Sequence, residues 1–161
     1  MHDSASPVEV KLPGPVLSLT AGSNHVCARL QNGRAMCWGS NELGQLGNGA
    51  SVFEGRVQDA SDRSPLPVAV VGVSSLTQLV ASGSQTCAVV AGSRPGAMCW
   101  GGGSDKAAEA DVTAAPHLVQ SGVIRALALD PRSGWLVDDA ARFLRWGMSG
   151  KQWLSKPILW R

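Results

Sequence analysis

The chain has 161 residues, a formal net charge of +2 and only 16% charged residues. This length is enough for one ordinary domain. The fourteen basic residues are scattered rather than gathered on one segment, so we expect no nucleic-acid partner. No apolar run reaches the length of a membrane span. Nineteen glycines and nine prolines favour many short strands joined by tight turns.

One pattern occurs three times along the chain, with decreasing fidelity. Its first copy reads AGSNHVCA over residues 21–28, followed by Asn32-Gly33 and by MCWG over 36–39. The second copy reads ASGSQTCA over 81–88 and MCWG over 98–101, and the third keeps only FLRWG over 143–147. In the first two copies a Pro-Val pair lies 20 residues before the first cysteine. A repeat that supplies about four short strands is typical of a propeller blade.

We therefore predict an all-β fold, a partial β-propeller of about three four-stranded blades plus one extra C-terminal strand. The strands of the first blade are expected near residues 8–10, 16–20, 25–30 and 35–38. The predicted units are blade 1 over 1–50, an inserted loop over 51–66, blade 2 over 67–103, a loop over 104–115, a degenerate blade 3 over 116–150, and the start of a fourth repeat or a closing strand over 151–161.

The Asn-Gly pair of the first copy predicts a hairpin that brings two cysteines together. If residues 31–33 form a three-residue loop with Gly33 in the left-handed conformation, Cys27 lies opposite Cys37. A two-residue turn would instead misalign the cysteines. Directly opposed residues on antiparallel strands lie within reach of a disulfide bond.

The second copy keeps the same pairing although its loop is two residues longer. Cys87 then lies opposite Cys99, because an insertion of two residues preserves the side-chain faces of a strand. In the third copy, Trp135 and Arg145 occupy the two cysteine positions. Both cysteines are thus lost together, as expected for a bonded pair.

The state of the cysteines decides between several kinds of chemistry. We predict the disulfides Cys27–Cys37 and Cys87–Cys99, with four reduced core cysteines as the alternative. Paired cysteines place the chain in a secreted or extracytoplasmic compartment, with a leader absent from this chain, whereas reduced ones place it in the cytoplasm. Nine and eleven intervening residues do not match the short spacing of zinc knuckles, so we expect no metal. A thiol enzyme using Cys27 with His25 is a second alternative.

The residues after the first cysteine pair resemble a known repeat. The run WGSNELGQLGNG over 38–49 resembles the regulator of chromosome condensation repeat, whose Trp-Gly-x-Asn-x-x-Gly-Gln-Leu-Gly motif is specific. The paired cysteines are similar to the bacterial branch of that family. The resemblance covers nearly the whole chain but weakens steeply, because the second copy has GGSDK over 102–106 in place of the motif's end.

The resemblance implies a propeller that acts mainly in protein–protein recognition. The residues that match are framework positions, and a fold does not by itself specify a function. The structural repeat signature comprises Trp38, Gly39, Asn41, Gly44, Gln45, Leu46, Gly47, Trp100, Gly101, Trp146 and Gly147.

Three further tryptophans lie outside that signature. Trp135, Trp153 and Trp160 are the candidate partner surface, and we expect them to form an apolar patch near the C-terminus with Phe143 and Ile158. The alternative is that they cap the last blade. Three blades leave two flanks open, because propellers close with four to eight blades. We therefore consider a fragment, or a homo-oligomer that closes through the open propeller edges.

The sequence contains no set of residues that specifies catalysis. We expect a non-catalytic protein-interaction scaffold of the β-propeller type, without cofactor, whose protein partner is unknown. The alternative is a regulator or guanine-nucleotide exchange factor of a small GTPase, which rests on family analogy alone.

Overall fold

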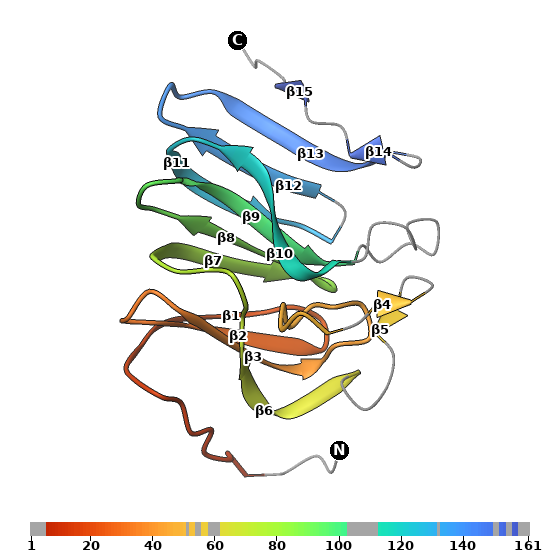
Figure 1. Cartoon of the computed structure of the whole chain (residues 1–161). Coiled ribbons are helices and arrows are strands. Elements are labelled where there is room, and N and C mark those ends of the chain that lie inside the picture. The colour runs from red at the N-terminus through yellow and green to blue at the C-terminus, as the bar shows by residue number, and fades with distance from the viewer. Residues whose placement is uncertain are drawn as a thin grey trace.

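The computed structural model describes residues 6–50, 52–53, 56–57, 62–102, 113–131, 133–149, 152–153 and 156–157. Three antiparallel sheets stack face to face along the chain, from the N-terminal sheet at the bottom of Figure 1 to the C-terminal one at the top. The described residues contain strands, turns and bends but no helix. The predicted all-β fold, a partial propeller of three blades, is confirmed.

Each of the three sheets is a blade, numbered here in chain order. Blade 1 has the strand order β1 (Val16–Ala21), β2 (His25–Leu30), β3 (Ala35–Ser40), β6 (Arg63–Ala69). Blade 2 comprises β7 (Leu76–Ser82), β8 (Gln85–Val90), β9 (Gly96–Gly101) and β10 (Thr113–Ser121). Blade 3 comprises β11 (Ile124–Leu129), β12 (Ser133–Asp138), β13 (Phe143–Ser149), β14 (Gln152–Trp153) and β15 (Lys156–Pro157), the last two both pairing with β13. The short strands β4 (Val52–Phe53) and β5 (Arg56–Val57) form a separate pair.

The central hairpin of blade 1 has the predicted register. Cys27 pairs with Cys37 across β2 and β3, and the two are joined by a disulfide with a Cα–Cα distance of 4.1 Å. Gly33 closes the turn at a φ of +76°, which favours glycine because other residues carry a Cβ that clashes there. The Gly33 amide donates to the Leu30 carbonyl at 3.0 Å.

The other two hairpins repeat this register. In blade 2, Cys87 pairs with Cys99 and is joined to it by the second predicted disulfide, also at a Cα–Cα distance of 4.1 Å. In blade 3, Trp135 pairs with Arg145 at the corresponding positions. The described residues contain no free cysteine, so the alternative of four reduced cysteines does not hold in this structure.

The strands group into sheets differently from the predicted units. Residues 8–10 form no strand, and the outer strand of blade 1 is β6, which was assigned to the inserted loop and to blade 2. Likewise residues 116–121 belong to β10 of blade 2, and Lys156 pairs with Arg145 of blade 3. Each Pro-containing strand thus completes the blade that precedes it in the sequence.

Proline explains why the Pro-containing strand of each blade lies at the edge of its sheet. Pro65 and Pro67 lie in β6, Pro116 in β10 and Pro157 in β15, and β6 and β10 are the last strands of their sheets. Proline cannot donate a backbone hydrogen bond, so it is tolerated on an edge strand and not in the middle of a sheet. A repeating sequence has no inherent first strand, and only this pairing shows where a blade begins. Residues 103–112, most of the predicted loop over 104–115, lie outside the described residues.

Two apolar cores fill the spaces between the three blades. The first contains Cys27 and Cys37 together with Leu79 and Trp100, so it joins blade 1 to blade 2. The second contains Cys87 and Cys99 together with Trp146, so it joins blade 2 to blade 3. Each disulfide therefore faces the following blade, and each tryptophan of the Trp-Gly motif in blades 2 and 3 faces the preceding one. We call the side of a blade that faces the following blade its trailing face, and the side that faces the preceding blade its leading face.

Candidate interaction site

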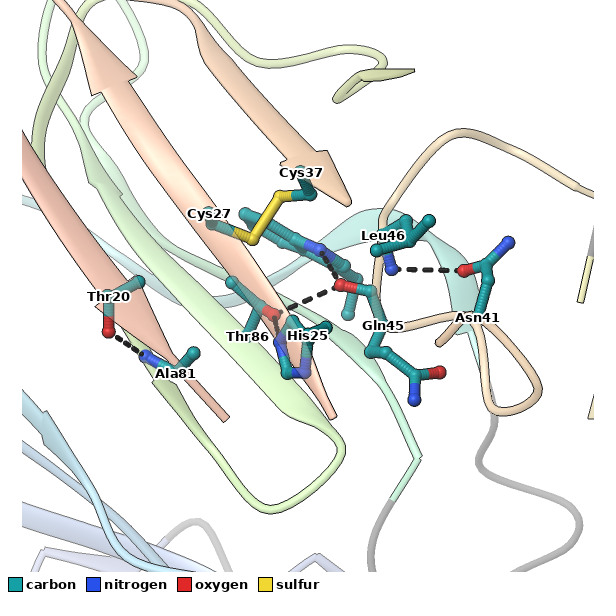
Figure 2. Close-up of a disulfide and its surroundings, with 10 residues drawn as sticks. Thr20, His25, Cys27, Cys37, Asn41, Gln45, Leu46, Ala81 and Thr86 are labelled. Atoms are coloured by element: carbon teal, nitrogen blue, oxygen red, sulfur yellow. Dashed lines mark hydrogen bonds between the residues drawn. A yellow bond between two sulfur atoms is a disulfide. The ribbon is translucent and has the colours of Figure 1, made fainter. Parts of the chain in front are cut away.

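A chain of polar groups joins blade 1 to blade 2 beside the first disulfide. The His25 Nε2 atom lies 2.8 Å from the Thr86 hydroxyl, which donates to the Gln45 carbonyl at 3.1 Å. The Trp100 indole donates to the same carbonyl at 3.0 Å. Figure 2 shows the His25 ring beside the Thr86 hydroxyl and the backbone carbonyl of Gln45 directed at that hydroxyl, while the Gln45 side chain points away. We call His25, Gln45, Thr86 and Trp100 the inter-blade junction.

The hydrogen bonds of the junction settle which nitrogen of His25 carries the proton. Because the Thr86 hydroxyl proton is directed to Gln45, its oxygen must accept from Nε2. Nδ1 is then a bare acceptor, and it is buried without a hydrogen-bond partner among the described residues. Burial lowers the pKa of His25 from 6.5 to about 4, because desolvation disfavours the charged ring.

The loop that follows β3 holds Gln45 in place. Asn41 is fully buried and accepts a hydrogen bond from the Leu46 amide at 3.0 Å, while the Gln45 side chain accepts one from the Leu43 amide at 2.9 Å. Gly47 has a φ of +64°, and a Cβ there would lie 2.6 Å from the Trp100 indole nitrogen. The repeat signature of this loop therefore serves the contact between blades.

The remaining signature residues lie on or beside this framework. Trp100 and Trp146 are buried, whereas Trp38 is half-buried because no described blade covers its face. Gly39 and Gly101 have positive φ values at the ends of β3 and β9, and Gly44 has one in the loop that carries Gln45. Gly147 lies in β13.

The trailing face of blade 3 differs from those of the other two blades. The Arg145 guanidinium stacks 4.9 Å from the centre of the Trp135 ring and donates to the Ser133 hydroxyl at 3.0 Å. The Trp135 indole lies 3.4 Å from a carboxylate oxygen of Asp130. Phe143, on the same face, is 53% exposed. An aromatic and cationic surface thus replaces the buried disulfide.

The candidate partner surface is only partly visible. Trp135 is half-buried on the trailing face of blade 3. Trp153 lies in β14, whose side chains are not described, and Trp160 lies outside the described residues. The gathering of the three tryptophans in one patch stays a prediction. Phe143, which the sequence also placed in this patch, pairs with Val137 and lies on the same face as Trp135.

The leading face of blade 1 also carries exposed apolar side chains. Leu19 is 64% exposed there, and its neighbours on the sheet by register are Ala28 and Met36. Val16 and Leu17 of the same strand are also exposed. The described part of the chain places no blade against this face.

The thiol-enzyme alternative is wrong for this structure, because Cys27 is bonded to Cys37 and His25 binds Thr86. Within the described ranges, no group of three or more His, Cys, Asp or Glu side chains is arranged to hold a metal, and no helix is long and apolar enough to cross a membrane. A shallow pocket is lined by Asn24, Gly39, Ser40, Glu42 and Arg63, and an Asp62–Arg63 ion pair of 3.5 Å lies beside it.

Two family models match the chain. Both describe the regulator of chromosome condensation repeat, one over residues 16–45 and the other over 32–90. A comparison with curated proteins found no match.

The solved structures that are similar in fold include three from different organisms. Human WBSCR16 has a TM-score of 0.66 at 18% identity, over 85% of this chain and 34% of its own. Prp20p from Saccharomyces cerevisiae, whose binding to Gsp1p and histones is described with its structure, has a TM-score of 0.63 at 19% identity, over 85% and 33%. The ectodomain of the Physcomitrella patens receptor kinase CR4 has a TM-score of 0.53 at 21% identity, over 88% and 32%. The chain spans about a third of the length of these proteins, and identities this low show the fold alone.

Proposed function

Because this chain carries regulator of chromosome condensation repeats, built as propeller blades, we propose that it is a protein-interaction scaffold and not an enzyme. The observation that carries the proposal is the trailing face of blade 3. At positions where blades 1 and 2 bury a disulfide, it presents the Trp135–Arg145 stack, with the exposed Phe143 beside it on the same face. Tryptophan and arginine are enriched among the residues that dominate protein interfaces.

The chemistry of this face indicates the kind of partner that it binds. Trp135 and Phe143 offer apolar area, and the guanidinium of Arg145 offers hydrogen-bond donors at its edge. A folded protein surface with apolar side chains and backbone carbonyl acceptors matches both the apolar area and the hydrogen-bond donors of this face. Trp153 and Trp160 extend this surface in the proposal. The likeness to Prp20p is one of fold, so regulation of a small GTPase is not part of the proposal.

The disulfides also support a location. Buried disulfides form and persist in oxidising compartments, so we infer that the chain works outside the cytoplasm.

Site-specific photo-crosslinking tests the scaffold function. A benzophenone amino acid replaces Phe143 in one variant and Leu118 of the middle blade in a control, since both side chains are more than half exposed. Irradiation in cells that produce the chain is expected to give a covalent adduct with a protein at position 143 and none at 118. Adducts at neither position, or equally at both, would contradict the proposal.

A further inference from the structure

Hydrogen bonds fasten the contact between blades 1 and 2 from the core to the inner strands. The Trp100 indole and the Thr86 hydroxyl of blade 2 both donate to the Gln45 carbonyl of blade 1. On the inner strands, the Ala81 amide of blade 2 donates to the Thr20 hydroxyl of blade 1 at 2.9 Å. Each of these donors of blade 2 thus finds an acceptor in blade 1.

At the core of the contact between blades 2 and 3, the described residues supply no such acceptor. Trp146 of blade 3 matches Trp100 and is buried in the second core, but its indole nitrogen has no hydrogen-bond partner among them. Gly134 takes the place of Thr86, since each pairs with the tryptophan of its own blade. A hydroxyl cannot be supplied from position 134, because a Cβ there would overlap the Trp146 ring.

The polar contact between blades 2 and 3 depends on one side chain, that of Gln78. Its amide donates to the Leu127 carbonyl at 2.7 Å and accepts from the Leu127 amide at 3.0 Å. Burial of the Trp146 indole without an acceptor costs free energy, which is recovered when the blades separate and water reaches the nitrogen. The junction between blades 2 and 3 should therefore open more readily than the one between blades 1 and 2.

Each disulfide is shielded by one of these two junctions. Cys27–Cys37 lies in the core between blades 1 and 2, and Cys87–Cys99 in the core between blades 2 and 3. All four cysteines are fully buried, so a reductant reaches a bond only after the blades on either side separate. Both junctions lie inside the chain, and each separates one of the three blades from the other two.

We propose that Cys87–Cys99 is a redox-sensitive bond, which a small dithiol reduces when blade 3 separates from blade 2, while Cys27–Cys37 stays oxidised between blades 1 and 2. In this reaction a thiolate of the dithiol bonds to one cysteine sulfur, and the other cysteine leaves as a thiolate and takes up a proton. The second thiol of the dithiol then displaces the first cysteine. The dithiol becomes a disulfide, and the protein gains two thiols.

Timed reduction of the oxidised full chain tests the order in which the two bonds break. The chain is incubated with dithiothreitol in native buffer at about pH 8, where an ordinary thiol is partly ionised. Samples are quenched with acid, the free thiols are alkylated, and peptide mass spectrometry assigns the labels to each cysteine pair. Cys87 and Cys99 are expected to be labelled roughly tenfold faster than Cys27 and Cys37, because the missing acceptor of Trp146 favours opening by about that factor.

Two matched variants each remove one polar contact from one junction. Gln78→Ala removes the bridge between blades 2 and 3, and blade 3 itself has alanine at the matching position, Ala126. Thr20→Val removes a hydrogen bond between blades 1 and 2, and blade 2 has Val80 at the matching position. Gln78→Ala is expected to speed reduction of the second disulfide at least about fivefold and to leave the first unchanged. Thr20→Val is expected to leave the second unchanged.

Several results would overturn the inference. These are equal rates for the two bonds, earlier reduction of Cys27–Cys37, or a Gln78→Ala chain in which both rates are unchanged or rise together. Acceleration of Cys87–Cys99 by Thr20→Val as large as that by Gln78→Ala would do the same. Amide hydrogen exchange of the unmodified oxidised chain is a second measurement, which needs no variant to fold. Strands β12 and β13 are expected to exchange faster than β2 and β3, and equal protection would contradict the proposed opening.

Discussion

Acid should weaken the contact between the first two blades through His25. The pKa of this ring is about 4 in the folded chain and 6.5 when exposed, so the unfolded state takes up a proton at a higher pH than the folded state does. The stability that the folded state gains from keeping His25 neutral is therefore complete above pH 6.5 and is lost as the pH falls toward 4. The difference between these two pKa values corresponds to roughly 3 kcal/mol of stability, of which about 2 kcal/mol is lost by pH 5.

The substitution His25→Gln isolates this contribution. Blade 2 has Gln85 at the matching position, where it is also buried, so glutamine fits this site of the fold and does not titrate. Urea unfolding of the oxidised chain, followed by tryptophan fluorescence at pH 7 and pH 5, gives the loss of stability for both variants. The natural chain should lose about 2 kcal/mol more than His25→Gln. Equal losses in the two proteins would refute the assignment of acid sensitivity to His25.

Three further changes probe the same framework by urea unfolding. Replacing both cysteines of either disulfide with alanine should lower the free energy of unfolding by roughly 2–3 kcal/mol, and an unchanged midpoint would contradict this. Gly47→Ala should cost at least about 1 kcal/mol, because its Cβ would meet Trp100, and more than Gly72→Ala, which shares a positive φ but has open space around it. Thr86→Val should cost about 1–3 kcal/mol, because the hydroxyl bonds two buried partners, whereas Thr86→Ser should keep most of that stability.

The hairpins and their disulfides could be predicted because their determinants are local. An Asn-Gly pair restricts the turn, the turn sets the register, and the register places Cys27 opposite Cys37. The same reasoning correctly paired Trp135 with Arg145 without any cysteine to guide it. What register cannot show is the stacking of Arg145 on the ring, since that depends on side-chain rotamers.

The limits of each blade and the inter-blade junction could not be predicted in the same way. Whether β6 belongs with the hairpin before it or after it depends on a tertiary pairing, in which Val68 lies opposite Cys37. His25 contacts Thr86, a residue 61 positions away on another sheet. The sequence showed a histidine near a cysteine, which suggested chemistry. The contact between blades gives the histidine a structural role instead.

The prolines of the outer strands have a consequence for how copies of this chain can aggregate. An exposed sheet edge normally invites another strand to add to it, which leads to fibrils. In β6, Pro65 and Pro67 remove two backbone donors from that edge. Growth by strand addition is thereby discouraged at the rim, while the flat faces of the blades stay available for specific contacts. Association is thus favoured through surfaces whose side chains can select a partner, and not through the unpaired backbone of an edge strand.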